Sequence, residues 1–128
     1  MSLRSPLGAA LGHGSARSGP AHGWNQRLSA LALVPLGLWF LCALLALPDL
    51  GHATVVAWIA TPTTAVLLLL FALLSLWHSL LGVATIVEDY VHGPVVKTAS
   101  LLALQAAHGV AALCVIVAVI AILGGSAR

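Results

Sequence analysis

Two histidines stand inside long apolar stretches, where a side chain that can ionise is unexpected. His78 lies in the run 75–82, and His108 lies in the run 98–123. An unpartnered ionisable group at membrane depth costs about 3 kcal/mol, so such a residue is a functional candidate by default. A neutral imidazole in a dry site is a good axial ligand for haem iron. It can equally hydrogen-bond a carbonyl or hydroxyl group on a neighbouring helix, and for His78 both interpretations stay open.

His78 belongs to a stripe of residues with helical spacing. Gly82 follows one turn later, Thr85 and Asp89 follow seven and eleven residues later, and Phe71 continues the stripe below. At 3.6 residues per turn, eleven steps return to within roughly 20° of the starting direction and climb roughly 16 Å. A glycine one turn from the imidazole would let a flat macrocycle approach the helix backbone. The stripe therefore suits a haem on one face of a helix.

The most polar stretch near a membrane face is 88–94, directly beyond this stripe. Here Tyr90 adjoins Asp89, and a tyrosine hydroxyl beside a carboxylate can hydrogen-bond a quinone carbonyl and assist its protonation. The alternative is an interfacial cap, with the tyrosine in the aromatic belt and the acids in water. The residues alone leave both interpretations open.

Three further polar residues, His108, Arg27 and Ser29, have possible roles in the helices or at their ends. His108 suits a hydrogen-bonded contact between helices better than a second haem ligand. Arg27 can extend to the interface, or it can pair with an anionic headgroup, a haem propionate or a partner subunit. Ser29, close to Arg27, can line the same region.

Composition places these residues in a membrane protein. The chain has 128 residues, of which 61% are hydrophobic and 6% are charged. Soluble domains carry roughly 25% charged residues, so a water-soluble domain is excluded. The net charge of +2 is too small to bind nucleic acid electrostatically. A polytopic membrane protein in contact with lipid remains.

Three apolar stretches, 28–47, 63–87 and 98–123, must position the polar residues. Each has about 20 residues or more, the length of a membrane-crossing helix. In lipid an unbroken apolar run can satisfy its backbone only as a helix. The prediction is an all-α membrane protein with three transmembrane helices in an up-down-up bundle. They form a single membrane domain over 24–125, preceded by a flexible segment over 1–27.

Lysine and arginine positions predict the orientation of these helices. Three arginines precede the first helix, none falls in the first loop, Lys97 lies in the second loop, and Arg128 ends the chain. The positive-inside rule then puts the N-terminus in the cytoplasm and the C-terminus outside. The first connection is predicted as a loop that 48–52 opens, and Cys42 and Cys114 are predicted to be small apolar fillers without a disulfide.

The segment 78–91 resembles the hydrophobic membrane-anchor subunit (D) of succinate dehydrogenase (respiratory complex II), also described as the small subunit of cytochrome b556. That family has a helix-two histidine, a glycine four residues later, and an Asp–Tyr pair eleven and twelve residues later. His78, Gly82, Asp89 and Tyr90 match all four positions. The segment 24–39 also resembles the alphaproteobacterial form of this protein.

The resemblance implies a specific function. Such a chain, with a second anchor subunit (C) that completes the bundle, would anchor the flavoprotein (A) and iron–sulfur (B) subunits to the bacterial inner membrane. The two anchors would share one haem b, with His78 as one axial ligand to the iron, Gly82 beside the macrocycle, and Arg27 at a propionate or a partner subunit. Ubiquinone would bind near Tyr90 and Asp89. Electrons would pass from succinate to quinone, in the tricarboxylic acid cycle and aerobic respiration, with no activity expected from the chain alone.

Three alternatives remain at this stage. A fumarate reductase anchor has the same architecture with the opposite direction of electron flow. A small transporter or channel subunit would use His78, His108 and Asp89 as a proton or ion path. A purely structural assembly protein would use His78 only for packing.

Overall fold

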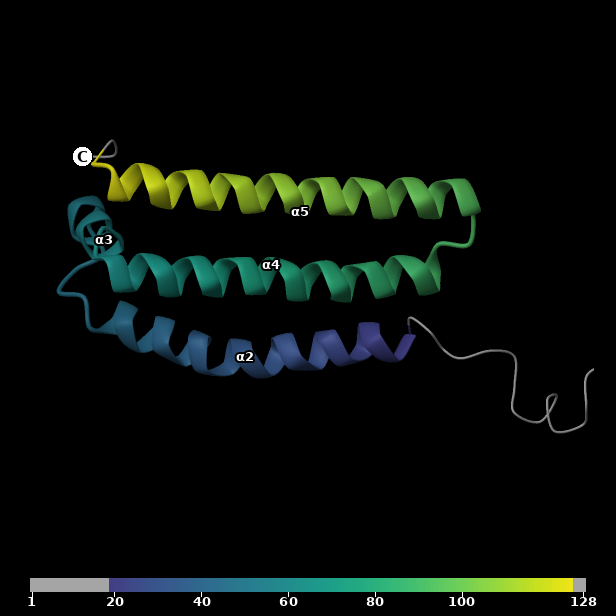
Figure 1. Cartoon of the computed structure of the whole chain (residues 1–128), viewed down its shortest axis with the longest axis horizontal. Helices are drawn as coiled ribbons and strands as arrows, with labels where there is room; N and C mark the ends of the chain where they lie inside the picture. Colours follow the sequence, from purple (N-terminus) through teal and green to yellow (C-terminus); the bar gives the residue numbers. More distant parts are fainter. Residues whose placement is uncertain (1–18, 126–128) are drawn as a thin grey trace, which may run out of the picture.

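The computed structural model describes residues 19–125, and its regular structure over that range is entirely helical (Figure 1). The helices are α2 (Gly19–Leu45), α3 (His52–Ile59), α4 (Pro62–Tyr90) and α5 (Pro94–Leu123). Within the described range, three segments are long and apolar enough to cross a membrane: Gly23–Leu45, Pro62–Tyr90 and Pro94–Leu123. The predicted all-α class with three candidate transmembrane helices is confirmed.

Local backbone chemistry sets several of the helix ends. Pro62 and Pro94 occupy the first turns of α4 and α5, where a missing N–H group has no intrahelical partner to lose. After α5 the chain passes through Gly125, whose φ of 76° lies in the left-handed region that favours glycine. The Gly125 amide donates to the carbonyl of Ile122 at 3.1 Å, which satisfies one of the last helical carbonyl groups.

The long helices extend beyond the apolar stretches that predict them. Residues 19–27 are helical, although the sequence placed them in a flexible segment; residues 1–18 of that segment lie outside the described part of the chain. Similarly, α4 continues through Tyr90 and α5 begins at Pro94. Hydropathy identifies the part of a helix that is apolar enough for lipid. It does not identify where the helical hydrogen bonding ends. The polar ends of these helices therefore escape a hydropathy-based prediction.

A short helix, α3, stands where the sequence predicts a loop between the first two spans. Ahead of it, the Asp49 carboxylate accepts hydrogen bonds from the Thr54 side chain and from the Gly51 amide, the latter at 2.7 Å. The bond from Thr54 has the larger effect and the bond from Gly51 the smaller one. Together they hold the pKa of the Asp49 carboxyl group below its ordinary value. With eight residues α3 is too short to cross a membrane. It contacts α4 and α5 and covers one end of the helix row.

The three long helices form an open row rather than a closed bundle. Each runs antiparallel to the next, and α4 lies between α2 and α5, which do not contact each other (Figure 1). In the described part of the chain the buried apolar side chains are only Ala65, Leu81 and Val119. Both faces of the row are therefore apolar and open, a surface suited to lipid or to another membrane subunit.

An aromatic cluster joins α2, α3 and α4. The ring centroids of Phe40 and Phe71 lie 5.2 Å apart, and Trp58 lies 6.3 Å from both Trp39 and Phe40. At Gly37 an added Cβ atom would lie 3.8 Å from the Phe71 ring. Since Phe71 is the lower end of the predicted stripe on α4, these contacts show that the stripe faces α2.

Candidate functional site: a histidine between two helices

His78 lies past the middle of α4 and is half-buried at the interface between α2 and α4. Its Nδ1 atom is 2.9 Å from the Oγ atom of Ser29 on α2. Ser29 is only 4% exposed, and its hydroxyl group donates to the backbone carbonyl of Gln26 at 2.9 Å. The imidazole is thus joined to the neighbouring helix through a buried hydroxyl group.

This network favours one assignment of the proton on the imidazole ring. A serine hydroxyl group has one hydrogen, and here that hydrogen is donated to the Gln26 carbonyl oxygen. With the hydrogen placed there, Ser29 Oγ accepts its second bond, and the Nδ1–H group of His78 is assigned as the donor. The Nε2 atom of the neutral ring keeps its lone pair, and within the described residues no hydrogen bond to Nε2 is present. In this assignment His78 has the tautomer that a metal ligand bound through Nε2 requires.

Gly82 lies one turn beyond His78 at the same interface. A Cβ atom at this position would lie 3.3 Å from the side-chain nitrogen of Gln26. The missing side chain thus makes room for an α2 residue, a packing role that the sequence did not suggest. The close approach to a macrocycle that was expected of Gly82 stays a prediction.

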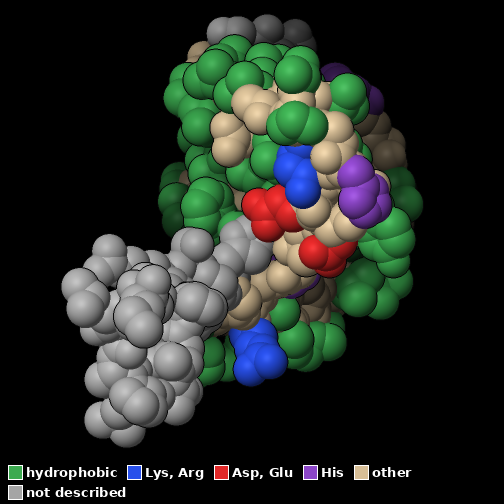
Figure 2. Space-filling model, turned by 90° about the vertical axis from the view of Figure 1, so that its right-hand side faces the viewer, with side chains coloured by type: hydrophobic (Ala, Val, Ile, Leu, Met, Phe, Trp, Pro, Cys, Tyr) green, Lys and Arg blue, Asp and Glu red, His purple; other side chains and the backbone are tan. Residues whose placement is uncertain are grey.

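Charged side chains gather at the end of the molecule where α2 begins, α4 ends and α5 begins (Figure 2). Glu88, Asp89 and Tyr90 are exposed there, and Tyr90 is 77% exposed. The Lys97 ammonium group donates to the backbone carbonyl of Glu88 at 2.6 Å, which ties the start of α5 to the last turn of α4. Arg27 is also exposed, near the start of α2.

The predicted site residues fall into two groups. His78 and Gly82 line the α2–α4 interface, whereas Asp89 and Tyr90 lie at the exposed end of α4. Eleven helical residues separate His78 from Asp89, a rise of roughly 16 Å. Within residues 19–125, neither Asp89 nor Arg27 forms an ion pair. Asp89 and Tyr90 therefore expose their polar atoms at the molecular surface.

His108 has a different environment on α5. Its Nδ1 atom is 2.9 Å from the Leu104 carbonyl oxygen, which can only accept, so Nδ1 carries the proton. Its Nε2 atom is 3.3 Å from the Ser79 hydroxyl group on α4. Both nitrogens are therefore engaged: Nδ1 bonds within α5, and Nε2 makes the interhelical contact that the sequence favoured for this residue.

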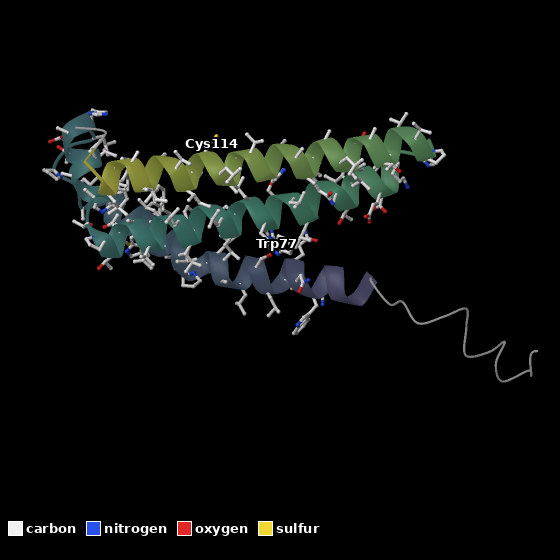
Figure 3. The ribbon with its side chains drawn as sticks, turned by 45° about the horizontal axis from the view of Figure 1, so that its top comes forward. Trp77 and Cys114 are labelled. Atoms are coloured by element: carbon white, nitrogen blue, oxygen red, sulfur yellow. The ribbon has the colours of Figure 1, made fainter. Side chains whose placement is uncertain are left out.

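A shallow apolar hollow of about 230 Å³ lies between α4 and α5 beside His108. Its lining includes Trp77, which is labelled on α4 in Figure 3. On the outer side of α5, Cys114 points away from α4, and both Cys114 and Cys42 are free and exposed (Figure 3). In residues 19–125 no three His, Cys, Asp or Glu side chains come together as a metal cluster. His78 is thus a single ligand-competent group rather than part of a multidentate site.

The sequence did not predict the contact between Ser29 and His78. It assigned Ser29 only to the general region of Arg27, and it gave Gln26 no role. One signal was present: Ser29 is the one hydroxyl-bearing residue in the stretch 28–47. A lone buried hydroxyl group in an apolar helix requires a partner, and an imidazole on the next helix is a suitable one.

Sequence comparisons with known proteins find relatives of this chain. Residues 1–123 match the family described as succinate dehydrogenase/fumarate reductase transmembrane subunit. The succinate dehydrogenase hydrophobic membrane anchor subunit of Rickettsia bellii is 33% identical over 90 residues, which cover 70% of this chain and 71% of that protein. The protein of the same description from Paracoccus denitrificans is 30% identical over 95 residues, or 74% of each chain.

A third relative, from Rickettsia conorii and of the same description, is 30% identical over 79 residues, covering 61% of this chain and 63% of that protein. No solved structure gives a significant match. The family match spans all three candidate transmembrane helices, including the helix that carries His78. The chain belongs to the succinate dehydrogenase/fumarate reductase transmembrane subunit family, as a multi-pass membrane-anchor protein.

Proposed function

We propose that the chain is the small membrane anchor of a succinate:ubiquinone oxidoreductase and supplies one axial ligand, His78, to a haem b. The second anchor subunit would supply the other ligand, and the flavoprotein and iron–sulfur subunits would dock at the charged end. The names of the relatives and the open helix row support the role of an anchor with partners. The bound haem would provide a one-electron carrier within the membrane.

The observation that carries the haem proposal is the bonding of His78. Its Nδ1–H group is satisfied by Ser29 inside the chain, while no described residue hydrogen-bonds Nε2. The residues therefore fit a haem that lies against this chain and is completed by a partner subunit.

Arg27 and Gly82 have supporting roles in this proposal. Arg27 is exposed and unpaired within residues 19–125, so its guanidinium group can meet a propionate or an acidic partner surface. Gly82 lets α2 lie close to α4, because a Cβ atom there would lie 3.3 Å from the Gln26 side-chain nitrogen, and the Ser29–His78 bond requires this closeness.

Tyr90 and Asp89 form the proposed ubiquinone contact. The Tyr90 hydroxyl group would donate to a quinone carbonyl oxygen, and Asp89 would support proton delivery to the reduced quinone. Their exposure at the end of α4 leaves both residues open to a partner subunit that could complete the pocket. A Tyr90→Phe variant is expected to lower succinate–quinone turnover at least tenfold with unchanged haem content, because the ring remains and only the donor is lost. Unchanged turnover would remove Tyr90 from the quinone site.

The charged end would face the cytoplasm. The described basic residues Arg27 and Lys97 both lie at this end, and Arg4 and Arg17 precede α2 in the chain. The opposite end, with Asp49 and α3, would face the periplasm. A chain that crosses three times then has its C-terminus outside.

Purification of the complex through a tag on this chain tests the proposed function. The expected preparation contains a flavoprotein, an iron–sulfur subunit and a second anchor, and a pyridine-haemochrome assay gives b-type haem. It reduces ubiquinone with succinate. Absence of both haem and flavin would overturn the proposal.

The family description favours one alternative, a fumarate reductase anchor, because it names both enzymes. Comparison of succinate–quinone turnover with quinol–fumarate turnover in the same preparation decides between them. Membership in this family favours an anchor over the transporter or channel hypothesis.

A further inference from the structure

The buried hydroxyl group of Ser29 has a role that neither the sequence pattern nor family membership assigns. Three groups form a chain of hydrogen bonds, here called the relay, at the α2–α4 interface. They are the His78 Nδ1–H group, the Ser29 hydroxyl group and the Gln26 carbonyl group. Both links measure 2.9 Å. Ser29 and Thr64 are the buried polar residues in the described part of the chain, and Ser29 is the more deeply buried.

We propose that Ser29 is a positioning residue that fixes the tautomer and ring orientation of His78 and tunes the reduction potential of the haem it would bind. This inference rests on the proposed function, because it requires iron at Nε2. A ligating histidine commonly donates its other N–H group to a fixed acceptor, which sets the ring orientation and raises the basicity of the ligand nitrogen.

The direction of the hydrogen bonds follows from the helix backbone. A serine hydroxyl group in a helix commonly donates to a carbonyl group three or four residues earlier, and Ser29 does so at Gln26. If Ser29 instead donated to His78, the Gln26 bond would be lost and the proton of the neutral ring would move to Nε2. That tautomer has no lone pair at Nε2 for iron. The bond to Gln26 therefore selects the ligand-competent form.

The relay also strengthens the hydrogen bond to the ring. An acceptor hydroxyl group that is itself donating is polarised, so the bond it receives becomes stronger. A stronger bond at Nδ1 gives the imidazole more anionic character and favours ferric over ferrous iron. Loss of the hydroxyl group should then raise the midpoint potential of the haem.

Three substitutions at Ser29 separate the hydroxyl group from the space it occupies. Ser29→Ala removes the group. Ser29→Thr keeps it with an added methyl group, and Ser29→Val has nearly the shape of threonine without the hydroxyl group. The assembled wild-type and variant complexes are compared by redox titration of the haem absorbance and by low-temperature EPR of the ferric form. Neither measurement depends on turnover.

We expect an upward shift of the midpoint potential and altered ferric g values in Ser29→Ala and Ser29→Val, with values close to wild type in Ser29→Thr. Haem loss in the valine variant but not in the threonine variant supports the same conclusion. Wild-type potential and g values in both the alanine and valine variants overturn the inference while the proposed function stands. Absence of b-type haem from the wild-type complex overturns the proposed function itself.

Discussion

The two interfaces between the long helices each contain a serine–histidine pair, yet the two imidazoles have different hydrogen-bond partners. At the α2–α4 interface, Ser29 meets the Nδ1 atom of His78 and no described residue meets Nε2. At the α4–α5 interface, Ser79 meets the Nε2 atom of His108, and Leu104 occupies Nδ1. Depth in an apolar helix is shared by both histidines. The difference that matters for metal binding is at Nε2, which has no hydrogen-bond partner among the described residues in His78 and is bonded to Ser79 in His108.

Gly82 at the α2–α4 interface and Gly109 beside the α4–α5 interface give the most severe test of this comparison. At Gly82 an added Cβ atom lies 3.3 Å from Gln26, whereas at Gly109 it meets nothing within 4 Å. Overpacking a close contact costs typically ~1–3 kcal/mol. Gly82→Val should therefore separate α2 from α4, stretch the Ser29–His78 bond and lower the haem content of the complex severalfold.

Gly109→Val is the matched control for that substitution. It adds the same atoms at the other interface, so the haem content should remain near wild type. The haem-to-protein ratio and the temperature at which haem is lost measure both variants. Equal haem loss in the two variants would contradict the special role assigned to the α2–α4 interface.

A smaller effect is expected from Ser79→Ala. The substitution removes the 3.3 Å contact to His108 Nε2, and interhelical hydrogen bonds in membranes contribute about 0.6 kcal/mol on average. We expect a slight decrease in thermal stability and an unchanged haem potential. A shift of the haem potential as large as that of Ser29→Ala would mean that the two serine–histidine pairs are equivalent. That result would contradict the assignment of the haem to His78 alone.

The smallest effect is expected at Asp49, outside both interfaces. Its lowered pKa means that the folded chain favours the carboxylate, so the stabilisation is present above the ordinary pKa and is lost as pH falls through the lowered value. Asp49→Asn should remove this acid-range dependence from the unfolding of α3, with no change at the haem. Hydrogen exchange of the α3 amides across the acid range measures it. An unchanged pH dependence in the variant would exclude Asp49 as its source.

Much of the fold could be predicted because the information is local. Runs such as 63–87 identify a membrane helix by length and apolar content alone, and the spacing from His78 to Asp89 places both residues on one helix face. The helix ends could not be predicted as well, because hydropathy does not register the polar turns around Arg27 and Tyr90. α3 has too few residues to leave a distinctive signal.

The candidate site was only partly predictable because its decisive contacts are tertiary. The sequence identified His78 as important but left open whether it binds iron or a neighbouring hydroxyl group. The structure shows the hydroxyl contact at Nδ1, and this contact is compatible with iron at Nε2. The space that Gly82 leaves for Gln26 and the open row of helices depend on how the helices pack, which a single sequence does not specify.

The most direct test of the central claim compares the two histidines in the assembled complex. Reduced-minus-oxidised difference spectra are recorded for the wild-type, His78→Ala and His108→Ala complexes at equal flavoprotein content. We expect the b-type haem bands to be lost in His78→Ala and retained in His108→Ala. Unaltered haem bands in the His78→Ala complex would contradict the assignment of His78 as an axial ligand.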